Sequence, residues 1–96
     1  GRPAASGERR LAGLLAEVAA CAAVPEGAAF SEKLNRAAYT AGGLVAAGHL
    51  TEDEAVRALR EAAELARPGQ RRRCLAVIRG GLNAGRTRPL ALGGRT

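Results

Sequence analysis

Residues 51–67 read TEDEAVRALREAAELAR, and this stretch predicts an α-helix both by its start and by its spacing. Thr51 and Glu54 have the T-x-x-E spacing of a capping box, in which each side chain accepts a hydrogen bond from the other residue's backbone N–H. Leu50 can pack onto the first turn, and the helix is expected to end near Arg67, before a Pro-Gly pair. The apolar line at helical spacing is Ala55, Val56, Leu59, Ala62 and either Ala63 or Leu65.

Three other segments have the same period of apolar side chains, and no part of the chain alternates as a strand does or repeats at a solenoid period. Each segment also has residues that favour a helix end. We expect helices over about 7–23 with Ser6 as N-cap, over 31–47 with Ser31 as N-cap and Gly48 as a left-handed C-cap, and over about 70–84 with Gly85 as C-cap.

The segment over 31–47 contains Gly42 and Gly43, each of which costs about 1 kcal/mol relative to alanine inside a helix. Such a pair usually marks a place where two helices pack closely. Together the four segments predict an all-α protein, a compact bundle or orthogonal array of about four helices with flexible termini. We divide the chain into a linker over 1–6, a helical accessory domain over 7–86 and a flexible tail over 87–96.

Length and composition restrict the kind of protein further. The chain has 96 residues, no methionine, one phenylalanine and one tyrosine, so a single small core is expected. Because methionine is absent and both ends are rich in Gly, Pro and Ala, we expect a piece of a longer protein. No apolar run approaches the roughly 20 residues of a membrane span, and no signal-peptide pattern is present, so we expect a cytoplasmic protein without a membrane partner.

No set of residues predicts a catalytic or metal site, so we expect no catalytic residue, no metal ligand and no cofactor in this domain. Cys21 and Cys74 are isolated among apolar neighbours and are expected to be buried free thiols. His49 is the only histidine and is expected to be an ordinary loop residue. The acidic run at 52–54 is explained by the positive end of a helix dipole.

Positive charge is concentrated near the C-terminal end of the chain. The formal net charge is +6, and residues 68–96 contain seven basic residues and no acidic one. Guanidinium groups pair bidentately with phosphate, and neutralised phosphates release counterions, so this third of the chain predicts binding to a polyanion. One edge of the last predicted helix is basic along its whole length through Arg72, Arg79, Asn83 and Arg86. The expected nucleic-acid-binding residues are Arg71, Arg72, Arg73, Arg79, Asn83, Arg86 and Arg88.

Three short motifs occur in an order that is hard to reach by composition alone: NRAAY at 35–39, GHLTEDEA at 48–55 and IRGGLNAG at 78–85. Through these motifs, residues 30–89 resemble the helical domain that follows the catalytic core in bifunctional DNA primase-polymerases of actinobacterial plasmids, phages and integrated elements. The resemblance implies a non-catalytic domain that helps to bind single-stranded DNA template and the initiating nucleotide. It also implies an upstream catalytic domain, a nucleotidyltransferase that uses Mg²⁺ and nucleoside triphosphates.

Under this resemblance Asn35, Arg36 and Tyr39 would contact a base or nucleotide. Tyr39 is the natural platform for base stacking, because the chain has so few aromatic residues. Phosphates would be held by Arg72, Arg79 and Arg86.

Two other functions stay open on the sequence. One is a protein-interaction module that links a primase core to a helicase or ATPase, with the arginines meeting an acidic surface of that partner. The other is a helix-turn-helix domain that binds duplex DNA, with the last helix as its recognition helix.

Overall fold

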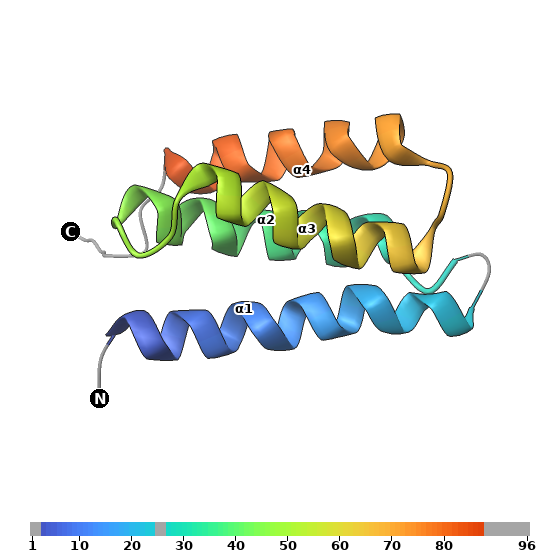
Figure 1. The fold of residues 1–96 in the computed structure, drawn as a ribbon, viewed down its shortest axis with the longest axis horizontal. Helices are drawn as coiled ribbons and strands as arrows, with labels where there is room; N and C mark the ends of the chain where they lie inside the picture. The colour runs from blue at the N-terminus through green and yellow to red at the C-terminus, as the bar shows by residue number, and fades with distance from the viewer. Residues whose placement is uncertain (1–2, 25–26, 88–96) are drawn as a thin grey trace.

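Four α-helices and one short 3-10 helix form the part of the chain that the computed structural model describes, residues 3–24 and 27–87. The elements are α1 (Pro3–Ala20), the 3-10 helix η1 (Cys21–Ala23), α2 (Phe30–Ala46), α3 (Glu52–Ala66) and α4 (Arg71–Arg86) (Figure 1). The described residues include no strand, so the all-α prediction is confirmed. The predicted tail over 87–96 lies outside the described residues except for Thr87.

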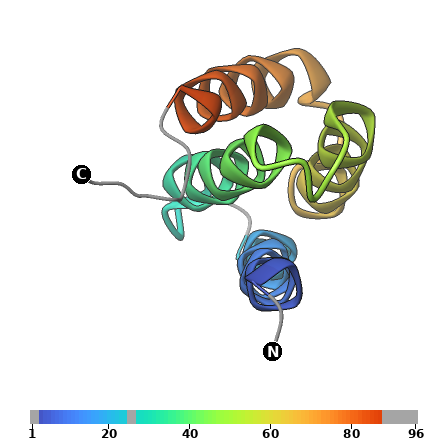
Figure 2. The same ribbon diagram turned by 90° about the vertical axis from the view of Figure 1, so that its left-hand side faces the viewer.

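Helix α2 lies in the middle of the fold and contacts each of the other three helices (Figure 2). Its most extensive interface is with α4, and smaller ones join it to α1 and α3. Helices α2 and α4 run in the same direction, and α1 and α3 run in the opposite one (Figure 1). The first turns of α2 and α4 and the last turns of α1 and α3 therefore all lie at the same end of the molecule.

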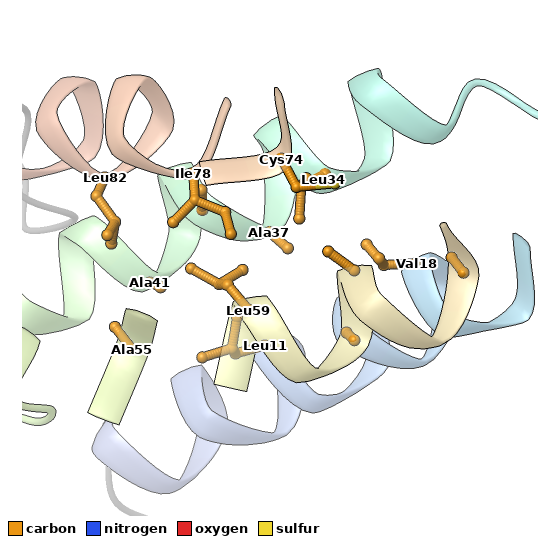
Figure 3. Packing of buried hydrophobic residues seen from close by; sticks show 14 of the residues in the cluster. Leu11, Val18, Leu34, Ala37, Ala41, Ala55, Leu59, Cys74, Ile78 and Leu82 are labelled. Carbon is orange, nitrogen blue, oxygen red and sulfur yellow. The ribbon is translucent and has the colours of Figure 1, made fainter. Parts of the chain in front are cut away.

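The core combines a few large aliphatic side chains with many alanines. Leu34, Leu44, Leu59 and Ile78 are the largest fully buried side chains, together with Val18. In Figure 3, Leu59 of α3 points into the centre of the cluster, between α4 above and α1 below. Because each alanine buries little area, the helix axes must come close together for the core to be filled.

Small residues permit a close approach of α2 and α4. A methyl group added at Gly85 would lie 2.1 Å from the Tyr39 carbonyl oxygen, and one added at Gly42 would lie 2.4 Å from the Leu82 carbonyl oxygen. A methyl group at Gly81 would lie 2.6 Å from the Ala38 Cβ. We call the contact of Ala38 and Gly42 with Gly81 and Gly85 the glycine seam.

The glycine seam settles two predictions about glycines. Gly42 and Gly43 mark close helix packing, as expected, and both are buried. The prediction that Gly85 ends the last helix as its C-cap is wrong, because α4 continues to Arg86 and Thr87 is its C-cap. Gly85 lies inside α4, where the absence of a side chain leaves room for the α2 backbone. Gly48 does take the predicted left-handed conformation, with φ of 83°, but the C-cap of α2 is the preceding residue, Ala47.

Both predicted serine N-caps are wrong. Helix α1 already begins at Pro3, so Ser6 falls inside it, and proline favours a first helical position because its φ is fixed. Helix α2 begins at Phe30, one residue before Ser31, and its N-cap Ala29 makes no side-chain cap. Ala28 and Ala29 both have positive φ, of 59° and 56°, a conformation that costs a residue with a side chain about 1 kcal/mol or more.

Arg67 holds this strained entry to α2 in place. Its side chain is 92% buried, and its guanidinium donates hydrogen bonds to the carbonyl oxygens of Cys21 (3.0 Å), Ala66 (2.8 Å) and Gly27 (3.4 Å). The guanidinium carbon also lies 4.9 Å from the centre of the Phe30 ring. One cation thus joins the start of η1, directly after α1, and the C-terminal end of α3 to the start of α2.

We predict that Gly85→Ala destabilises the protein by at least about 2 kcal/mol, because the added methyl group would push the α2 backbone away. The matched control is Gly80→Ala, since Gly80 lies in the same helix with nothing within 4 Å of an added methyl group. That variant should gain about 0.5–1 kcal/mol from helix propensity. Urea denaturation measures both free energies of unfolding, and equal values for the two variants would contradict the glycine seam.

We also predict that Arg67→Lys lowers the free energy of unfolding by about 2 kcal/mol, because lysine keeps the charge but has no planar fork to reach three carbonyl oxygens. Arg60→Lys is the control, because Arg60 is exposed on α3. Thermal and urea denaturation should show a change within about 0.5 kcal/mol for the control. A similarly small effect at Arg67 would show that its hydrogen bonds do not stabilise the fold.

Candidate functional site

An open groove runs between α3 and α4. The two helices are antiparallel, so Glu52 at the start of α3 meets Arg86 at the end of α4. The floor of the groove includes apolar side chains from both helices, namely Val56, Ala63, Cys74 and Leu82.

Charged side chains of both signs line this groove. Five are arginines and four are carboxylates, which leaves one positive charge in excess. The arginines are Arg57, Arg60, Arg71, Arg79 and Arg86, and the carboxylates are Glu52, Asp53, Glu61 and Glu64. An apolar floor with charged walls suits an occupant that has both a flat or apolar part and a charged part.

The structure divides the predicted nucleic-acid-binding residues among several places. Four of them line the groove: Arg71, Arg79, Asn83 and Arg86. Arg72 is exposed but does not line it, and Arg73 lines a small hollow at the start of α2 that also includes Glu32. Arg88 lies outside the described residues.

The predicted basic edge of α4 is interrupted at its C-terminal end. Arg86 forms a salt bridge with Glu52, and both side chains remain partly exposed, at 38% and 54%. The second terminal nitrogen of Arg86 lies 3.5 Å from the Asn83 side-chain oxygen. The sequence shows no carboxylate near these residues along the chain, and the fold supplies one from α3.

The predicted base-contact residues lie on a different surface. The side-chain oxygen of Asn35 lies against Gly81, and the carbonyl oxygen of Tyr39 lies against Gly85, so both residues border the glycine seam. None of Asn35, Arg36 and Tyr39 lines the groove. Successive helix residues turn by about 100°, so Arg79 and Asn83 point nearly opposite to Gly81. Helix α4 therefore separates Asn35 and Tyr39 from the groove residues Arg79 and Asn83.

Sequence reasoning missed Arg57 and Arg60, which face the groove from α3. Their spacing of three residues places them along one edge of a helix, and that signal is present in the sequence. The residues around them are mostly acidic, however, so the segment has a negative total charge that conceals them. Only the packing of α3 beside α4 brings Arg57 and Arg60 to the same groove as Arg79.

The predicted capping box is present at the start of α3, which forms one side of the groove. The Thr51 hydroxyl accepts a hydrogen bond from the Glu54 backbone N–H at 3.1 Å, and the Glu54 carboxylate accepts one from the Thr51 backbone N–H at 3.0 Å. The backbone hydrogen bond from Thr51, followed by its side-chain hydrogen bond, lowers the pKa of Glu54. The box thus holds the first turn of α3, from which Glu52 reaches Arg86.

The two cysteines and the histidine lie where the sequence predicts them. Cys21 and Cys74 are buried free thiols, and burial raises the pKa of Cys74, so its thiolate is scarce near neutral pH. His49 is exposed between α2 and α3. Among residues 3–24 and 27–87, no three His, Cys, Asp or Glu side chains are grouped as a metal site would need.

Comparison with known proteins gives no relative for this chain: no family model, curated protein or solved structure matches it. Within the described part of the chain, every helix is too short or too polar to cross a membrane.

We predict that Thr51→Ala lowers the free energy of unfolding by about 1 kcal/mol through loss of the N-cap. In the same variant the pKa of Glu54 should rise toward its ordinary value, because both hydrogen bonds in the box depend on the cap geometry. A lowered carboxyl pKa stabilises the fold above the ordinary glutamate pKa, and this contribution is lost as the pH falls through the folded value. Carboxyl-detected NMR titration measures the pKa, and an unchanged value in Thr51→Ala would contradict the assignment.

Proposed function

We propose that this chain is a non-catalytic binding domain for single-stranded nucleic acid and that the strand lies in the groove between α3 and α4. The observation that carries the proposal is the apolar floor flanked by arginines from both helices. Bases can rest on the half-buried Val56, while guanidinium groups of Arg57, Arg60 and Arg79 pair with phosphates. A single strand has unpaired bases that can reach such a floor, whereas the bases of a duplex are stacked inside it.

The resemblance of residues 30–89 supports a more specific proposal, in which single-stranded DNA is the template of a primase-polymerase. The catalytic carboxylates, Mg²⁺ and nucleoside triphosphates would then belong to an upstream domain, and this chain would hold template beside it. The charge of residues 68–96 and the order of the three motifs support this proposal. Helix α3 runs antiparallel to α4, unlike the crossing of about 90–120° in a helix-turn-helix, so we do not propose duplex binding.

We predict that the protein binds fluorescein-labelled single-stranded DNA with an affinity that falls as salt rises, and that Arg79→Ala weakens this binding about fivefold or more. Arg10→Ala is the matched control, because it removes the same charge from an exposed position on α1, which does not line the groove. Arg36→Ala tests the predicted base-contact surface separately. Fluorescence anisotropy across a salt series measures the DNA affinity of the unmodified protein and of the three variants.

Two results would reject the proposed function. One is the absence of binding at low salt, and the other is an equal loss in Arg79→Ala and Arg10→Ala, which would mean that only total charge matters. A circular dichroism spectrum of each variant establishes that the helices remain folded.

The mixed charge of the groove favours a second candidate, a site for another protein. Four carboxylates among the lining residues suit a partner with charges of both signs, and Leu65 beside them is 66% exposed. A partner helicase or ATPase would meet this surface. Pull-down after nuclease treatment distinguishes the two functions, because a protein partner is retained and nucleic acid is not.

A further inference from the structure

The charges of the groove follow an order along its length. One end includes Asp53 and the salt bridge between Glu52 and Arg86, and the middle contains Arg57 and Arg60 of α3 with Arg79 of α4. The other end includes Glu61, Glu64 and Arg71. The basic part of the groove is therefore its centre, and carboxylates stand toward both ends.

Glu52 and Arg86 differ from the other lining residues because they form the one salt bridge among the described residues. Arg86 also contacts Asn83, so its guanidinium is held by two partners from different helices. Both side chains remain accessible to water, and a salt bridge of this kind is worth at most about 1 kcal/mol. A change at Glu52 or Arg86 therefore costs the fold little, so variants of either residue should remain folded.

We infer that Glu52 is an internal competitor that withholds Arg86 from an anionic ligand, so that the groove engages a short anionic segment through Arg57, Arg60 and Arg79. This inference rests on the proposed function. It concerns specificity, because the carboxylate limits how many phosphates of a strand the groove neutralises. Removal of the Glu52 charge should free Arg86 and extend the contact by about one phosphate.

The salt dependence of binding gives the number of phosphates that the protein neutralises. For single strands the logarithm of the affinity falls with the logarithm of the salt concentration with a slope of about −0.7 for each phosphate neutralised. Three available arginines therefore predict a slope of about −2 for the unmodified protein. Glu52→Gln should make the slope steeper by about 0.7 and tighten binding about fivefold at low salt.

A double-mutant cycle tests whether Glu52 acts on Arg86 in particular. The proteins are the unmodified chain, Glu52→Gln, Arg86→Gln and the double variant, with oligothymidylates of two to twelve nucleotides as the probe. Glu8→Gln on α1 is the matched control, because it removes the same charge from an exposed position that does not line the groove. Circular dichroism and a urea curve for each variant exclude unfolding as the cause.

We expect Arg86→Gln alone to change the affinity by less than about twofold, since Glu52 already occupies Arg86. The gain of Glu52→Gln should vanish in the double variant, and Glu8→Gln should leave the slope unchanged. As the oligonucleotide is lengthened, the affinity of the unmodified protein should level off at about four nucleotides. Longer strands then add only a slow rise, because they offer more positions at which the protein can bind. In Glu52→Gln the affinity should level off at a greater length.

The outcomes separate this inference from the proposed function. If the double variant keeps the tighter binding of Glu52→Gln, or if Glu8→Gln binds as tightly, the effect comes from general repulsion between carboxylates and DNA. Either result would overturn the inference, while the proposed DNA binding would stand. A salt slope that is the same in the unmodified protein and Glu52→Gln would overturn it as well. If the unmodified protein binds no oligonucleotide even at low salt, both the inference and the proposed function fail.

Discussion

The close contact between α2 and α4 is the constraint on which the rest of this structure depends. Seven of the seventeen buried hydrophobic residues among those described are alanines, and a methyl side chain contributes so little area that the fold is stable only if the helix axes approach closely. Gly42, Gly81 and Gly85 permit that approach because their backbones meet neighbouring backbone atoms directly. The seam also fixes how α4 is turned about its axis, and this rotation determines which of its side chains face α3.

That rotation relates the core to the candidate site. The side of α4 that faces α2 bears glycines, and the side that borders α3 bears Arg79 and Arg86. Helix α3 supplies the opposite wall, and Arg67 at its end anchors it to the strained turn before α2. In the described residues, small side chains thus build much of the interior and long cations much of the surface, and Arg67 is an exception because it is buried.

The sequence alone predicts the four helices, but it does not predict which residues come together at the candidate site. Helical spacing and the T-x-x-E motif predicted α3 correctly, because capping and burial there depend on neighbours within one helix. The predicted caps at Ser6, Ser31 and Gly85 are wrong for different reasons. Helices α1 and α2 begin earlier than the serines, at Pro3 and Phe30, and at Gly85 the contact with the α2 backbone outweighs the local signal for a helix end. The salt bridge between Glu52 and Arg86 joins residues 34 positions apart, and no local pattern identifies such a pair. The same holds for two carbonyl partners of Arg67, Cys21 and Gly27, which lie 46 and 40 positions away.

The parallel arrangement of α2 and α4 also has a consequence for the order of folding. Gly42 and Gly85 meet across 43 positions of chain, and the whole of α3 lies in the loop that must close before they touch. Loop closure carries an entropic cost that sequential helix hairpins largely avoid, so folding rates fall as contacts become more distant in sequence. The largest interface of this small domain is thus a late event, and an emerging chain keeps α2 without its main partner until α4 has been synthesised.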